Sequence, residues 1–112
     1  MKIRKLRQYL REIHEDNSDS WTLYFVDQDD DYFTITDIYE DDDGDVCLEA
    51  DEGCDYSASD IYNSLRKYSG DQYVYIYNPY YDESFEIEGG WYWDDEDDLV
   101  MDIHYHPNYD DY

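Results

Sequence analysis

The sequence predicts an α+β fold with two helices and about six antiparallel strands. Two stretches with helical spacing are each followed by three short runs rich in aromatic and β-branched residues. Clusters of Asp and Gly between those runs predict turns. The order helix, strand, strand, strand thus occurs twice, which indicates a tandem αβββ-αβββ duplication. Its repeats would span 2–51 and 57–105 within one compact domain, 1–112.

The first helix is expected over residues 2–15. Its apolar residues recur at helical spacing and form one stripe, Ile3, Leu6, Leu10 and Ile13. Arg4, Arg7 and Arg11 form a basic stripe beside it. Cations in a first helical turn oppose the helix dipole. We therefore expect the acidic body of the protein to offset them.

Three strands are expected next, over 21–27, 32–40 and 46–50. The first contains the run WTLYFVD, and the second alternates Phe33 and Ile35 with threonines. Acidic turns separate them at Asp29–Asp31 and at Asp41–Asp45. In the second turn, Gly44 supplies a residue that tolerates a positive φ.

The second half begins with a helix expected over 58–69. Ser57 and Asp60 fit a capping box, Arg66 and Lys67 would lie in the last turn, and Gly70 would end the helix. Strands are expected at 72–78, 84–88 and 99–105. Pro79 and the pair Gly89-Gly90 mark breaks between them.

The two halves align in residue type when the chain is shifted by 52 positions. Phe33 then meets Phe85, Ile35 meets Ile87, and Leu23 meets Tyr75. A shift of 53 places the acidic turn at 41–45 on 94–98, so two related acidic hairpin tips are expected. The strand tyrosines Tyr24, Tyr73, Tyr75 and Tyr77 are expected to divide between two sheet faces.

The charge of the chain excludes several classes of partner. Its 32 acidic residues outnumber 7 basic ones, for a net charge of −25, and every acid lies at or after Glu12. Such a surface repels nucleic acid and anionic membranes and attracts basic partners. Disorder is disfavoured because 41% of residues are hydrophobic and 20% aromatic. With two cysteines, Cys47 and Cys54, and no targeting segment, we expect reduced thiols in the cytoplasm.

Metal binding and catalysis find little support. An EF-hand register on Gly44 would place Tyr39 and Ala50 at ligand positions that require carboxylates. His104 and His106 would share one strand face, but a surface pair explains them. Carboxylates occur everywhere, so no catalytic pair stands out, and the chain has no phosphate-binding glycine loop. We expect a protein that is not an enzyme and needs no cofactor or metal.

The acids and aromatic residues themselves are the predicted partner-binding feature. Alternating carboxylates such as Glu86 and Glu88 would form a row of charges on one strand face. Trp91 and Trp93 would anchor the contact, with burial of one of them in the core as an equal alternative. Further interface candidates are Tyr80, Tyr81, Tyr109 and Tyr112. The remaining predicted contact residues are the turn acids Asp29, Asp30, Asp31, Asp41, Asp42, Asp43, Asp45, Asp94, Asp95, Glu96, Asp97 and Asp98.

In these features the chain resembles the DNA-mimic inhibitors of phages and mobile elements, which are short, strongly acidic and rich in aromatic residues. The resemblance is of type, because those proteins share no motif. It implies a viral anti-CRISPR or anti-restriction protein that occupies the nucleic-acid surface of a CRISPR effector nuclease or restriction enzyme and so evades host defence. Two alternatives stay open: an immunity protein for a nuclease toxin, and a divalent-cation-binding protein. The oligomeric state also stays open, with a homodimer among the alternatives.

Overall fold

The structure is a computed structural model that describes residues 1–53 and 56–105. Within these ranges the chain forms two helices and six strands, as expected for the α+β class. The elements in chain order are α1 (Ile3–Glu15), β1 (Leu23–Val26), β2 (Tyr32–Glu40), β3 (Val46–Asp51), α2 (Ala58–Leu65), β4 (Val74–Asn78), β5 (Glu83–Trp93) and β6 (Leu99–Tyr105).

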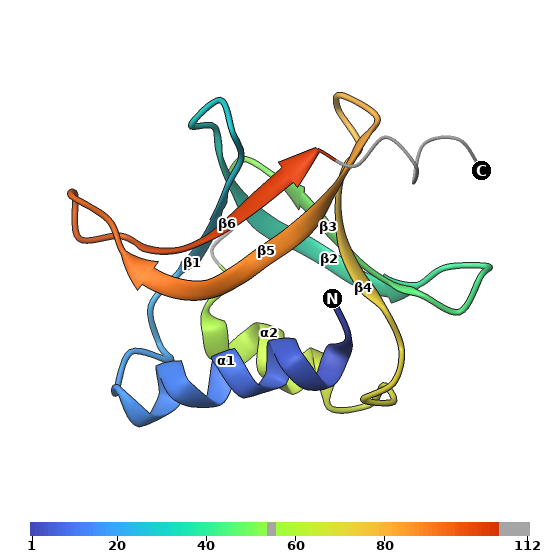
Figure 1. Cartoon of the computed structure of the whole chain (residues 1–112), viewed down its shortest axis with the longest axis horizontal. Helices are drawn as coiled ribbons and strands as arrows, with labels where there is room; N and C mark the ends of the chain where they lie inside the picture. The colour runs from blue at the N-terminus through green and yellow to red at the C-terminus, as the bar shows by residue number, and fades with distance from the viewer. Residues whose placement is uncertain (54–55, 106–112) are drawn as a thin grey trace.

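The six strands form a closed barrel in the order β1-β2-β3-β4-β5-β6, with β6 paired to β1 (Figure 1). The expectation of an entirely antiparallel sheet is wrong, because β3 pairs with β4 and β6 pairs with β1 in parallel. The connection through α2 explains the first parallel pair. It returns the chain to the starting end of β3, so β4 must run in the same direction. Hairpins join the other strands, which pair antiparallel.

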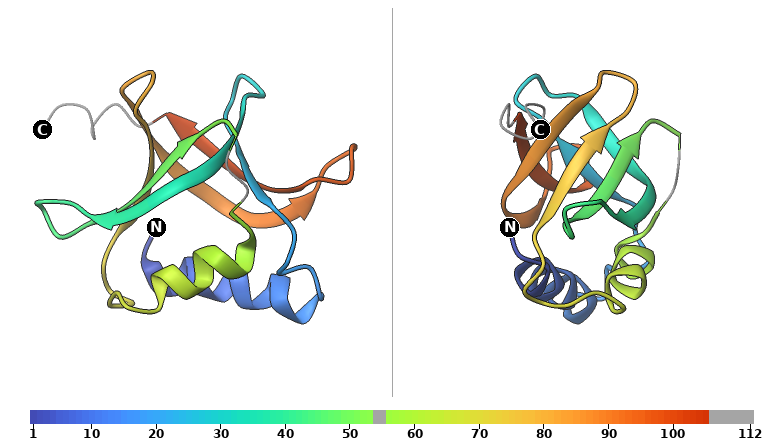
Figure 2. Two further views of the ribbon diagram at one scale, coloured as in Figure 1. Left: turned by 180° about the vertical axis from the view of Figure 1, so that it is seen from behind. Right: turned by 90° about the vertical axis from the view of Figure 1, so that its right-hand side faces the viewer.

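The hydrophobic core lies between the inner face of the barrel and the two helices. Both helices lie side by side across one end of the barrel (Figures 1 and 2). The apolar stripe of α1 is confirmed, since Ile3, Leu6, Leu10 and Ile13 are at most 2% exposed. From the strands, Phe25 and Phe85 are the largest fully buried side chains. The helices therefore seal an opening that would otherwise admit water to the core.

The strand tyrosines do not divide between two faces. In β4 the buried residues Val74 and Ile76 alternate with the half-buried Tyr75 and Tyr77, and Tyr73 precedes them in the outward register. In β1 the half-buried Tyr24 likewise lies between the buried Leu23 and Phe25. Leu23 thus matches Val74 by burial, and the shift of 52 that pairs it with Tyr75 is wrong over this strand. All four tyrosines point outward.

The largest differences from the predicted element boundaries are at the end of α2 and along β5. Helix α2 begins with the expected capping box of Ser57 and Asp60 but ends at Leu65, so Arg66 and Lys67 follow the helix. Gly70 is not its C-terminal stop. Its carbonyl instead accepts a hydrogen bond from the backbone N–H of Arg4 at 3.1 Å. Strand β5 runs through Gly89-Gly90, where the pairing register shifts, because a bulge absorbs the glycines without ending the strand.

The basic stripe of α1 packs against the end of α2 more than against the acidic body. The Arg7 guanidinium donates hydrogen bonds to the backbone carbonyls of Leu65, at 2.6 Å, and Tyr68. These carbonyls lie at the C-terminal end of α2, where a cation is favoured. The Arg4 side chain forms an exposed ion pair with Asp71 at 3.1 Å.

In the described ranges, neither helix combines the length and apolar character that a bilayer-spanning segment requires.

We expect Arg7→Ala to destabilise the fold by about 1.5–3 kcal/mol, because it removes charge-assisted hydrogen bonds to half-buried carbonyls. Arg4→Ala, which removes the same charge and an exposed ion pair from the same helix, should cost less than about 1 kcal/mol. Urea unfolding of both variants measures the difference. Equal losses would show that net charge, and not the link between the helices, sets the effect.

Candidate partner-binding surface

Three hairpin turns share one hydrogen-bonded geometry, and we call them the acidic tips: 27–31, 41–45 and 94–98. In each, Oδ1 of the first Asp accepts hydrogen bonds of 2.9–3.0 Å from the backbone N–H groups of the third and fifth residues. The first and fifth residues are also joined through the backbone at 2.8–3.1 Å. The fourth residue has a positive φ, 62° at Asp30, 83° at Gly44 and 61° at Asp97.

Asp suits the first position of these tips because its side chain can replace a backbone acceptor in a tight turn. Asp and Gly also suit the fourth position, since they tolerate the left-handed region better than most residues do. Local chemistry thus forms the tips. They hold the intervening acids in defined positions at the ends of the hairpins.

The leading aspartates Asp41 and Asp94 are engaged within the molecule. Oδ2 of Asp41 accepts a hydrogen bond from the Tyr75 hydroxyl at 2.9 Å, and Oδ2 of Asp94 accepts one from the Tyr32 hydroxyl at 2.5 Å. The Tyr32 hydroxyl, together with backbone N–H groups, lowers the pKa of Asp94, and the same contact raises the pKa of Tyr32. These two carboxylates therefore organise the surface.

The acids in the middle of the tips are exposed, whereas two of the closing acids are partly buried. Asp45 and Asp98, which close two of the tips, are half-buried. Partial burial, with Asp41 and Asp43 nearby, raises the pKa of Asp45. The exposed tip acids are Asp29, Asp30, Asp31, Asp42, Asp43, Asp95, Glu96 and Asp97.

The acidic tips do not form one continuous patch. The hydrogen bond between Tyr32 and Asp94 joins the base of tip 27–31 to tip 94–98. Tip 41–45 projects from the end of the long axis opposite tip 94–98 (Figures 1 and 2). The molecule extends 38 Å along that axis. Tips 27–31 and 94–98 are thus linked through Tyr32, and we call this pair of tips the Tyr32 surface.

The carboxylates of Glu86 and Glu88, which were predicted to form a row of exposed charges, both have partners within the protein. Glu86, with a side chain 16% exposed, accepts hydrogen bonds from the amino group of Met1 and the Tyr73 hydroxyl. The carboxylate of Glu88 lies 2.9 Å from Nδ1 of His104. Glu86 thus fixes the N-terminus to β5, and only Glu88 of this pair is substantially exposed.

The tryptophans divide between core and surface. Trp91 is half-buried and packs against the core. Trp93 is 37% exposed and meets Trp21 edge to face, with ring centroids 5.2 Å apart. Sequence reasoning missed Trp21, which was assigned to a strand but lies before β1 and is 51% exposed. Trp93 directly precedes tip 94–98 in the sequence, so the ring contact places Trp21 near this tip.

Tyrosines on the outer face support the Tyr32 surface, and only Tyr24 among them was singled out from the sequence. Tyr32 packs against Tyr24 at a ring distance of 5.9 Å. The Tyr92 hydroxyl donates to Asp102 at 2.6 Å, and this hydrogen bond raises the pKa of Tyr92 to about 12. The sequence does place tyrosines and acids at outward-facing positions of the strands, and this pattern could have indicated hydrogen bonds between them. Only the strand pairing shows which tyrosine hydroxyl donates to which carboxylate.

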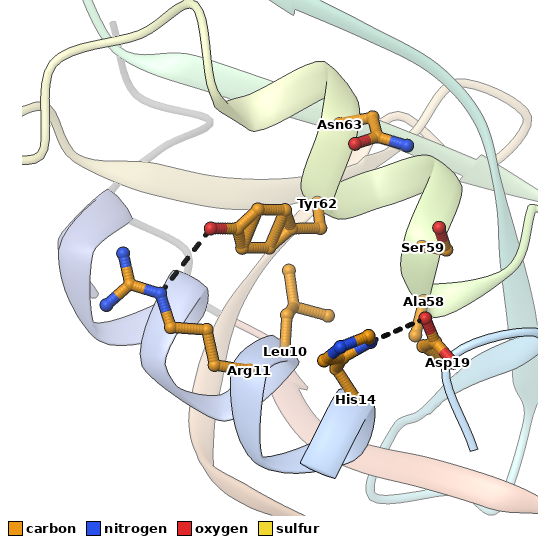
Figure 3. A pocket seen from close by; sticks show the side chains of 8 residues that line it. All are labelled: Leu10, Arg11, His14, Asp19, Ala58, Ser59, Tyr62 and Asn63. Atoms are coloured by element: carbon orange, nitrogen blue, oxygen red, sulfur yellow. Dashed lines mark hydrogen bonds and ion pairs between the residues drawn. The ribbon is translucent and has the colours of Figure 1, made fainter. Parts of the chain in front are cut away.

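A separate groove of about 290 Å³ lies between the two helices (Figure 3). Nδ1 of His14 contacts Oδ2 of Asp19 at 2.8 Å, and Nε of Arg11 donates to the Tyr62 hydroxyl at 3.4 Å. The hydrogen bond with His14 lowers the pKa of Asp19. None of the partner-binding residues predicted from the sequence lines this groove, so it is distinct from the acidic surface.

The His, Cys, Asp and Glu side chains are the residues that could bind a metal ion. Across residues 1–53 and 56–105, no three His, Cys, Asp or Glu side chains are grouped so that they could hold a metal ion. Of the histidine pair, His104 lies in β6, whereas His106 lies outside the described residues, as do Cys54, Tyr109 and Tyr112. Cys47 is a free, buried thiol.

Comparison with protein-family models, with curated proteins and with solved structures finds no match to this chain.

We expect Asp94→Asn to destabilise the fold at neutral pH and to lose this effect in acid. The folded-state pKa of Asp94 lies below its ordinary value of 3.8. Its ionised form thus stabilises the fold above about pH 4, and that contribution is lost as the pH falls through the folded-state pKa. Urea unfolding at pH 7, 5 and 3 measures the change. Asp95→Asn, on the exposed second residue of the tip, is the control with equal charge, and parallel pH profiles for both variants would contradict the assignment.

Proposed function

We propose that this protein is a non-enzymatic, acidic DNA mimic that binds the nucleic-acid surface of a basic protein and blocks it. A CRISPR effector nuclease or a restriction enzyme is the proposed target. The observation that carries the proposal is the set of exposed carboxylates on the Tyr32 surface, held at hairpin ends by turn hydrogen bonds. No cofactor takes part in the mechanism.

Separation of charge within the molecule supports this proposal. All seven Lys and Arg residues lie in or next to α1 or directly after α2, so they belong to the helical layer. The acidic tips extend from the barrel to the sides and away from that layer (Figure 1). A basic protein is therefore attracted to the barrel and oriented by it during encounter, which raises the association rate.

Preorganisation is the second support. A charged side chain on a mobile loop must be ordered when it binds, and this ordering weakens affinity. Here the loops that present Asp95, Glu96 and Asp97 are closed by backbone hydrogen bonds and anchored by the contact between Tyr32 and Asp94. Duplex DNA likewise presents closely spaced charges on a stiff backbone, about one per 1.7 Å of helix axis.

The exposed pair of Trp21 and Trp93 supplies the apolar part of the proposed interface. Trp residues are enriched among those that contribute most to binding, usually at the centre of a contact surrounded by polar residues. Trp93 directly precedes the acids of tip 94–98 in the sequence, and Trp21 packs against it. We assign the anchoring role to Trp93 with Trp21, while the half-buried Trp91 supports the barrel.

We further propose that the two halves arose by duplication. Each half contains one helix followed by a three-stranded meander, and tips 41–45 and 94–98 occupy the same place in each. Asp27 and Asn78 also occupy matching places, at the ends of β1 and β4. The second half diverges at Gly89-Gly90, where its central strand carries the larger bulge.

The proposal is tested by retaining proteins from a bacterial lysate on the immobilised chain at low salt, with duplex DNA as competitor. A retained nucleic-acid-binding protein that DNA displaces supports mimicry, and its identity separates a defence nuclease from a toxin with a cognate immunity protein. Retention that is unchanged between about 50 and 500 mM salt would contradict the electrostatic basis.

Neutralising tip 94–98 should weaken capture of that retained protein roughly 10-fold, because three exposed charge contacts are lost. The variant is Asp95→Asn/Glu96→Gln/Asp97→Asn, and association kinetics at several salt concentrations measure the effect. Glu12→Gln/Glu15→Gln/Asp16→Asn removes the same charge from exposed positions at the end of α1. If this control weakens binding equally, net charge and not the Tyr32 surface determines recognition.

A further inference from the structure

A pocket of about 290 Å³ opens at the end of the barrel opposite the helices. It lies between the β1–β2 tip and the β4–β5 connection, which are neighbours at the top of Figure 1. Its charged lining consists of three carboxylates, Asp31, Asp51 and Glu52, and no Lys or Arg lines it. The aromatic lining is Tyr32, Phe33, Tyr80 and Tyr81. Acids and aromatic rings together are suited to an organic cation.

The aromatic residues at the rim are unusually exposed. Tyr80 is 78% and Tyr81 58% exposed, and their rings meet edge to face at 5.0 Å. Burial of large aromatic side chains is favourable, so their exposure at a pocket rim marks surface that a partner can cover.

Asn78 provides an independent sign of a ligand. It is 1% exposed, and its Oδ1 accepts a hydrogen bond from the backbone N–H of Tyr81 at 2.9 Å, which orients the amide. Within the part of the chain that the structure describes, its Nδ2 atom is buried and has no acceptor. Leaving such a donor unpaired in the interior is unfavourable, so a ligand that supplies an acceptor gains from pairing with it. The matching residue of the first half is Asp27, which has no donor and whose Oδ1 accepts two N–H groups.

We propose that this pocket binds an arginine residue of a polypeptide partner. The guanidinium lies among the three rim carboxylates and against the tyrosine rings, and Asn78 donates to a main-chain carbonyl of the same segment once Tyr80 turns aside. Arginine fits better than lysine, because its planar, donor-rich group stacks on aromatic rings and pairs with carboxylates in fork geometry. The carbonyl is required because a guanidinium has no acceptor for Nδ2.

This inference rests on the proposed function and deepens it. A DNA-binding surface is rich in arginine, so a mimic that encloses one arginine gains a specific contact beyond general attraction between charges. Asp31 belongs both to tip 27–31 and to the pocket, so the pocket continues the Tyr32 surface. The pocket is tested without the macromolecular partner, so its failure is distinguishable from failure of the inhibitor proposal.

The test follows backbone and Asn side-chain amide signals by NMR while acetyl-arginine methylamide is titrated into the full chain. Saturable shifts at Asn78, Tyr80 and Tyr81 are expected, with acetyl-citrulline methylamide, the neutral isostere, giving none. Tyr80→Leu/Tyr81→Leu should weaken binding about 5- to 30-fold from loss of two cation–π contacts. Tyr39→Leu, at an exposed aromatic residue outside the pocket, should leave binding unchanged. Equal shifts with citrulline, or shifts spread over all acidic tips without saturation, would overturn the proposal.

A second arm isolates the donor of Asn78. Methylguanidinium lacks the carbonyl, so acetyl-arginine methylamide should bind the unaltered protein about 2- to 12-fold more tightly, the contribution of one hydrogen bond. Asn78→Asp keeps the turn acceptor, as Asp27 does in the first half, but removes the donor. Asn78→Asp should bind acetyl-arginine methylamide no more tightly than methylguanidinium. Because both probes carry the same guanidinium charge, the ratio of their affinities is independent of the carboxylate that the substitution adds. An advantage that persists in Asn78→Asp would overturn the assignment.

Discussion

The parallel pairing of β1 with β6 is the constraint on which the rest of the structure depends. It joins Leu23–Val26 to Leu99–Asp102 and closes the ring of strands, so that no sheet edge is left unpaired in the barrel. Closure also buries the inner residues of both halves in one core, which the helices seal. The hairpin ends can then carry acids at high density, because they contribute little to that core.

The protein accommodates its high density of negative charge because some of the carboxylates accept hydrogen bonds within the fold. Leading aspartates close the tips, and Glu86 holds the N-terminus. Tyrosine hydroxyls also donate to the leading Asp94 and to Asp102. Such hydrogen bonds favour the ionised form, and the lowered pKa of Asp94 shows this effect. At Asp45, by contrast, partial burial and neighbouring acids raise the pKa. The acids are therefore two populations, one structural and one exposed.

The exposed population and the barrel mouth together form a directional surface. The Tyr32 surface supplies charge, Trp21 and Trp93 supply apolar area, and the pocket around Asn78 supplies a concave feature of defined chemistry. The helical layer, which holds the basic residues, lies across the other end of the barrel. This polarity agrees with a partner that approaches the barrel and not the helices.

The sequence alone determined the local features: the stripe of Ile3, Leu6, Leu10 and Ile13, the capping box at Ser57, the order of elements and the acidic turns. Each depends on side-chain periodicity or on hydrogen bonds within a few residues. Tertiary structure decided the parallel pairs, the end of α2 where Arg7 binds its carbonyls, and the outward direction of Tyr75. It also decided which acids are exposed, because the partners of Glu86 and Asp94 lie 85 and 62 residues away along the chain. Charge patterning cannot specify such distant contacts, which arise only when the barrel closes.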